Sequence, residues 1–129
     1  MCFSSVSAKN VTFNLGIDTN LTCGNKTWDE IVYVIWNIIL PNNHKSCQVG
    51  LNDEGQVEDT CKDGKVLRNT SESQSYLHIP NFSNSDVGFY KCELVYNGGC
   101  EIYILNVDII GNLITLRMLP PLWMKCRSY

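Results

Sequence analysis

The stretch Asp86-Val-Gly-Phe-Tyr-Lys-Cys92 is the part of this chain that decides its fold. It places Tyr90 two residues before Cys92 and four residues after Asp86. In two-layered β-sandwiches, a tyrosine at this position returns its hydroxyl to the upstream backbone and holds the crossing between two strands, the tyrosine corner. The run therefore predicts a strand that carries a buried, disulfide-bonded cysteine, with Asp86 and Tyr90 as structural residues.

Two residues nearer the N-terminus complete this pattern. Cys23 ends one β-type segment and Trp36 lies inside the next. In an immunoglobulin domain, one disulfide joins two sheets that lie about 10 Å apart, and a tryptophan packs against it. The wide separation of Cys23 and Cys92 is typical of the variable type, which has additional strands between them. We therefore predict an all-β, immunoglobulin-like β-sandwich of the variable type, with a Cys23–Cys92 disulfide and Trp36 in its core.

The rest of the chain has the pattern of an antiparallel β-protein. Short runs of β-branched and aromatic residues alternate with Gly, Asn, Asp and Ser clusters, and no run has a helical period. The predicted strands are residues 6–13, 17–23, 31–40, 47–51, 65–68, 75–79, 88–95 and 101–109. Alternation ends after Ile110, so we expect a V-type domain over residues 1–110 and a tail without assigned fold over 111–129.

Cysteines and glycosylation motifs indicate the compartment. Seven cysteines in 129 residues favour an oxidising environment, because cytosolic reductants would keep them as thiols. Several Asn-x-Ser/Thr motifs point to the same secretory route. We expect the extracellular side of the plasma membrane, or secretion. The candidate glycosylation sites are Asn10, Asn20, Asn25, Asn69 and Asn81.

Composition and motifs argue against other classes of function. A net charge of −3 gives no basic footprint for a nucleic acid. His44 and His78 are isolated, and neither a Cys-x-x-Cys pair nor a Gly-x-Ser-x-Gly elbow occurs. We therefore expect no enzyme, no catalytic residue, no metal and no cofactor. The apolar stretch 109–124 is broken by Arg117 and two prolines, so a membrane would be reached only through segments absent from this chain.

Two segments resemble one receptor family. Val34-Ile-Trp-Asn-Ile-Ile-Leu40, followed by Ser46-Cys47 and by Asp59-Thr-Cys61, is similar to receptors for the OX-2 membrane glycoprotein (cluster of differentiation 200). The resemblance covers about residues 21–109 and implies a second disulfide, Cys47–Cys61. The two cysteines would close a polar loop, residues 48–60, that has no other evident means of ordering.

The resemblance also implies a function and leaves alternatives. It implies the ectodomain of a cell-surface immunoregulatory receptor whose partner is a glycoprotein of the immunoglobulin superfamily, similar to OX-2. Family members continue into a second domain, a membrane span and a cytoplasmic tail, so a secreted truncated decoy is one alternative. The second alternative is another recognition or adhesion domain of the same fold. Gly98-Gly99 and the absence of a Phe-Gly-x-Gly motif disfavour an antigen receptor. Cys2 and Cys100 are candidates for a third pair, and Cys126 is left over.

Alternation of side chains predicts a ligand-binding face. With Trp36 and Cys92 inward, and with Tyr103, Leu105 and Val107 also inward, the neighbouring positions point outward. Such a face exposes more aliphatic side chains than a monomer needs, which favours a partner surface unless β-propensity or cover by residues 109–124 explains them. The predicted face residues are Ile35, Asn37, Ile39, Lys91, Glu93, Val95, Ile102, Ile104 and Asn106.

Glycans would leave this face open if the strands are placed as expected. Asn10, Asn20, Asn69 and Asn81 are predicted to lie on the opposite sheet or at its edges, and Asn25 in the loop after the second strand. The outward face positions include none of these asparagines. Carbohydrate would then shield one side of the sandwich and leave the other for docking.

Overall fold

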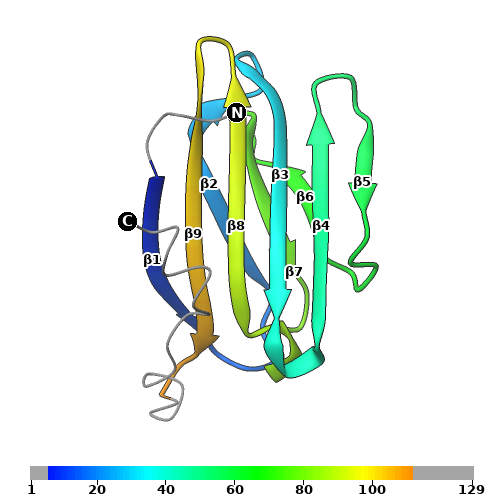
Figure 1. The fold of residues 1–129 in the computed structure, drawn as a ribbon, viewed down its shortest axis with the longest axis vertical. Helices are drawn as coiled ribbons and strands as arrows, with labels where there is room; N and C mark the ends of the chain where they lie inside the picture. Colours follow the sequence, from blue (N-terminus) through cyan, green and yellow to red (C-terminus); the bar gives the residue numbers. More distant parts are fainter. Residues whose placement is uncertain (1–5, 112–129) are drawn as a thin grey trace.

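Residues 6–111, the part of the chain that the computed structural model describes, form nine strands in two sheets and contain no α-helix. One sheet has six strands in the order β1-β9-β8-β3-β4-β5, and the other has the order β2-β7-β6 (Figure 1). The all-β sandwich prediction is confirmed. The strands are β1 Val6–Phe13, β2 Thr19–Thr27, β3 Ile31–Leu40, β4 Lys45–Asn52, β5 Val57–Asp59, β6 Val66–Asn69, β7 Gln74–Ile79, β8 Gly88–Tyr96 and β9 Gly99–Ile109.

Strand β3 shows why these residues form a half-buried strand. Along it, burial alternates, with Val34, Trp36, Ile38 and Leu40 in the core and the residues between them half-buried. Branched and aromatic side chains fit such a pleated surface, and a period of two separates the faces. The predicted bounds of β1 and β3 agree with the structure.

The strand predicted over residues 47–51 lies within β4, and the polar loop predicted over residues 48–60 is a β-hairpin that this strand forms with β5. Strand β5 pairs with β4, with Leu51 opposite Val57 and Val49 opposite Asp59. The turn is closed by Asn52, whose side-chain Oδ1 accepts hydrogen bonds from the backbone N–H groups of Glu54 and Gln56. The expectation of a loop ordered only by its disulfide was wrong, because backbone pairing and this local Asn turn order a stretch that has no apolar alternation.

Strand β2 also extends beyond its predicted end, to Thr27, and carries Asn25 within it. The register with β7 shifts between Thr22 and Thr27. Gly24, with a φ of +71°, lies in this shift, a conformation that glycine adopts without the cost of a Cβ. Asn25 therefore lies in a strand, and its predicted place in a loop is wrong.

The core contains the features that the stretch 86–92 predicts. Cys23 and Cys92 form a disulfide with a Cα–Cα distance of 6.1 Å, and Trp36 is fully buried opposite Cys92. The Tyr90 hydroxyl donates a hydrogen bond of 2.6 Å to the Asp86 carbonyl, which is the tyrosine corner. Burial raises the pKa of Tyr90, so the phenol stays a protonated donor.

Beside this corner lies a buried ion-pair network that the sequence reasoning missed. The Lys65 ammonium, with 1% of its side chain exposed, lies 2.9 Å from Asp86 Oδ1 and 2.6 Å from Asp63 Oδ2. Burial acts to raise the pKa of Asp63, but the hydrogen bond and charge of Lys65 outweigh it and lower that pKa. In the sequence, nothing distinguishes a buried lysine after an Asp-Gly turn, such as Lys65, from a lysine that is exposed to solvent.

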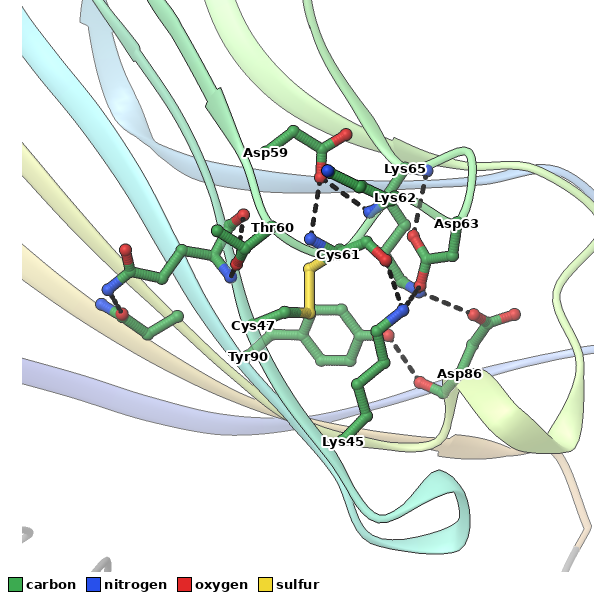
Figure 2. The surroundings of a disulfide bond; sticks show 12 residues. Lys45, Cys47, Asp59, Thr60, Cys61, Lys62, Asp63, Lys65, Asp86 and Tyr90 are labelled. Carbon is green, nitrogen blue, oxygen red and sulfur yellow. Dashed lines mark hydrogen bonds and ion pairs between the residues drawn. A yellow bond between two sulfur atoms is a disulfide. The ribbon is translucent and has the colours of Figure 1, made fainter.

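The second disulfide lies next to this network. Cys47 and Cys61 are bonded with a Cα–Cα distance of 4.9 Å, the pairing that the family resemblance implies. Figure 2 shows Lys45 to one side of the bridge, with its ammonium donating to the Cys61 carbonyl. The disulfide therefore ties β4 to the segment that leads into the buried lysine.

Candidate ligand-binding face

Strand register brings the nine predicted face residues onto one side of the six-stranded sheet. Trp36, Cys92 and Tyr103 are direct neighbours across β3, β8 and β9, and they point into the core. The adjacent rows therefore point the other way. Those rows are Ile35–Glu93–Ile102 and Asn37–Lys91–Ile104. We call this side of β3, β8 and β9, with the outward positions of β4 and β5, the outer face.

The outer face has an apolar cluster of its own, separate from the core. Phe89 and Ile104 are 7% and 8% exposed, and Ile39 and Ile102 pack against them. Phe89 was not among the predicted face residues, although the same alternation that selected Lys91 points it outward. The cluster thus joins three strands of the outer face.

The expectation that the aliphatic face residues are exposed is wrong for Ile104 and too strong for the others. Ile104 is buried, and Ile35, Ile39, Val95 and Ile102 are half-buried. The reason is topological, because β1 pairs in parallel with β9 and places Ala8 beside Ile104. Strand β9 is therefore an inner strand, and its side chains have neighbours on both flanks.

Polar side chains on the outer face are held by hydrogen bonds between strands. The Tyr33 hydroxyl donates to Glu93 Oε1 over 3.2 Å, and Gln48 Nε2 donates to Asn37 Oδ1 over 2.6 Å. Burial and the charge of Glu93 raise the pKa of Tyr33, so the phenol remains neutral beside the carboxylate. These bonds fix the polar positions around the apolar cluster.

Towards β5 the outer face is hollowed. A hollow of about 380 Å³ lies over β3, β4 and β5. Gly50, one of the residues that line it, lacks a side chain, and a Cβ there would come within 3.2 Å of Ile35 Cγ1. No sequence signal identified this site, because it depends on three strands coming together. Its lining residues are Tyr33, Ile35, Gly50, Leu51, Asn52, Gln56, Val57 and Glu58.

The asparagines of all five glycosylation motifs are exposed, but besides Asn25 a second one, Asn10, is not where it was expected. Asn10 lies on β1 directly beside Asn106 of β9. It therefore belongs to the six-stranded sheet and points to the outer face, at the edge opposite β5. The prediction that it lies with the opposite sheet is wrong, because the first strand joins β9 rather than β2. Asn20 and Asn69 are on the three-stranded sheet, and Asn81 follows β7.

Other sequence expectations concern cysteines and the tail. Cys100 is disulfide-bonded. The hypothesis that Cys2 is its partner stays a prediction, because Cys2 lies outside the described residues, and Cys126 lies outside them as well. The expected tail and its apolar stretch lie almost entirely beyond residue 111, outside that range as well. Within residues 6–111, no helix is long and apolar enough to cross a membrane, and no group of side chains could hold a metal ion.

The chain shares its architecture with known proteins. A family model described as the immunoglobulin V-set domain matches residues 6–104. No curated protein is similar enough in sequence to match. Among solved structures, the extracellular portion of mouse CD200RLa is similar in fold, with a TM-score of 0.70 and 19% identity. That similarity covers 79% of this chain and 55% of the other, so this chain spans about half the length of the structure it matches. Because the family model covers most of the chain, this protein belongs to the immunoglobulin V-set domain family.

Proposed function

We propose that this chain is the ligand-binding head of an immunoregulatory receptor, and that it binds an immunoglobulin-superfamily glycoprotein similar to OX-2. Membership of the V-set family and the fold shared with mouse CD200RLa support a recognition domain that works outside the cell. The resemblance of residues 34–40, 46–47 and 59–61 to OX-2 receptors supports the class of ligand. The domain would act at the outer surface of the plasma membrane or as a secreted form.

The observation that carries this proposal is the second apolar cluster. In the described part of the chain, the three-stranded sheet packs on the inner face, so the core does not need Phe89, Ile104, Ile39 and Ile102. Phe89 and Ile104 are buried beneath this face, so the apolar surface that the cluster offers to a partner comes from the half-buried Ile39 and Ile102. Apolar residues surrounded by polar ones such as Lys91 are the usual anatomy of a protein interface. We therefore place the docking surface on the outer face.

Surface plasmon resonance against the OX-2 glycoprotein ectodomain tests the proposal. Ile102→Asp places a charge in the apolar cluster, and we expect about 30-fold weaker binding, the effect of losing one central interface residue. Val66→Asp is the matched control, because Val66 lies on the three-stranded sheet and is 38% exposed. It should bind within about twofold of the original chain.

Two results would contradict the proposal in different ways. If the ectodomain does not bind the original chain at micromolar concentration, the class of ligand is wrong. If it binds and Ile102→Asp has no effect while Val66→Asp weakens binding, the docking surface lies on the three-stranded sheet instead.

A further inference from the structure

One row of residues across the outer face contains a glycine, which has no side chain, and two glutamates. Across four neighbouring strands the register places Glu93 of β8 beside Ile35 of β3, Ile35 beside Gly50 of β4, and Gly50 beside Glu58 of β5. Since Gly50 contributes no side chain, the hollow of about 380 Å³ opens at this point of the row. The row is therefore a concave site with an acidic residue on each flank.

The hollow has apolar walls and an acidic rim. Tyr33 and Ile35 contribute apolar surface, and Glu58 lines the side formed by β5. On the other side Glu93 is held by the Tyr33 hydroxyl. Among the ion pairs of residues 6–111, none includes Glu58 or Glu93. Both carboxylates thus lack a cationic partner within the described chain.

The wall on the β5 side is ordered by its own hydrogen bonds. Besides accepting two backbone N–H groups, Asn52 donates from Nδ2 to Gln56 Oε1 over 2.7 Å. A ligand that enters the hollow therefore does not have to order this turn, which lowers the entropy cost of binding. The site also lies far from the Asn10 motif, because β5 and β1 are opposite edges of the sheet.

These features select the chemistry of an occupant. An aliphatic or aromatic side chain would fill the hollow but would desolvate the carboxylates of its rim without pairing them. A side chain with an apolar stem and a planar cation matches both parts, since a guanidinium stacks on an aromatic ring and pairs with a carboxylate through two N–H groups. Lysine offers a point charge and no planar surface for Tyr33.

We propose that this hollow receives an arginine side chain of the protein ligand, with the stem over Ile35 and Gly50 and the guanidinium at Glu58. Tyr33 forms the wall against which the guanidinium stacks. This inference rests on the proposed function, because it assigns the side chain that the ligand presents to the outer face. It adds a charged anchor to the apolar docking surface.

Nuclear magnetic resonance with small probes tests the chemistry of the hollow directly. The full 129-residue chain is titrated with N-acetyl-arginine methylamide and, separately, with the uncharged N-acetyl-norleucine methylamide. We expect saturable shifts of the Tyr33, Gly50 and Glu58 amides with the arginine probe only. Glu58→Gln should weaken this binding about tenfold, the effect of losing a charge-assisted hydrogen bond, whereas Glu54→Gln in the neighbouring turn should not.

Three results would overturn the inference. One is equal binding of the norleucine probe, which would make the occupant an apolar side chain. Another is arginine binding that Glu58→Gln leaves unchanged or that never saturates. The third is concentration-dependent shifts of the same amides without any probe, which would make a second copy of the chain the occupant.

Binding to the OX-2 ectodomain separates this inference from the proposed function. If the ectodomain binds and Glu58→Gln weakens it about tenfold relative to Glu54→Gln, both stand. If it binds with equal affinity to both variants, the arginine inference fails and the receptor function stands. If the arginine probe binds the hollow while the ectodomain binds no form of the chain, the proposed ligand fails and the chemistry of the hollow stands.

Discussion

Replacing Lys65 by methionine tests the network that supports the tyrosine corner. Lys65 is 1% exposed, and its ammonium lies within 3 Å of both Asp63 and Asp86. Methionine keeps the apolar volume of the lysine stem and removes only the charge. Asp63 and Asp86 would then face each other without the cation between them, next to the Tyr90 hydrogen bond.

The size of the effect follows from how deeply the partners are buried. Removing one member of a fully buried ion pair costs about 3–5 kcal/mol. The side chains of Asp63 and Asp86 are 25% and 14% exposed, so water can solvate part of the unpaired charge. We therefore expect a loss of about 2–3 kcal/mol, which lowers the Tm of a domain this size by about 8–12 °C.

Urea unfolding followed by tryptophan fluorescence, to which the buried Trp36 contributes, measures this loss, with far-UV circular dichroism as the second probe. Lys9→Met is the matched control, because Lys9 is exposed on β1 and forms no ion pair within residues 6–111; it should change stability by less than about 0.5 kcal/mol. If Lys65→Met unfolds at the same urea concentration as Lys9→Met, the network contributes no stability and the reasoning is refuted.

Three further predictions concern close packing, the second disulfide and acid. Gly88→Ala should destabilise the domain by about 3 kcal/mol, because a Cβ there would lie 2.0 Å from the Ile39 carbonyl oxygen; an unchanged Tm in a calorimetric scan would contradict this. Replacing both Cys47 and Cys61 by alanine should lower the free energy of unfolding by about 3 kcal/mol, because the unfolded chain is no longer restricted by a bridge between residues 14 positions apart. Urea unfolding of this variant and of the original chain measures the difference. The pKa of Asp63 is lowered in the folded state, because Lys65 outweighs the effect of burial. The ionised Asp63 carboxylate therefore stabilises the folded domain above the unfolded pKa near 4, and this stabilisation is lost as the pH falls through and below that value. The Tm difference between the original chain and Asp63→Asn should therefore be large at pH 7 and small at about pH 2, and a difference that persists at about pH 2 would count against the assignment.

Local sequence patterns predicted the fold because they report on burial within single strands. Cys23, Trp36 and the run from Asp86 to Cys92 each combine a residue type with a spacing that one architecture requires. Alternation along residues 31–40 assigned the inner and outer side chains, since a strand has a period of two wherever one face is buried. The same alternation placed the nine predicted face residues on one side of the sheet.

Errors arose where a position depends on which strands become neighbours. Asn10 and Ile104 were misjudged for one reason, the pairing of β1 with β9, and no local pattern reports that choice. Strand β5 was missed because exposed polar residues such as Glu58 can form a strand at a sheet edge without any apolar period.

The sequence by itself determined the sandwich, its central disulfide, the tyrosine corner and the direction of the outward side chains, because each depends on residues within one strand or on a spacing specific to the fold. Only the tertiary structure decided the partner of β1, the burial of Lys65 between Asp63 and Asp86, and the hollow at Gly50. These features join residues that are far apart in the chain, and the hollow exists because three strands place a glycine between larger side chains.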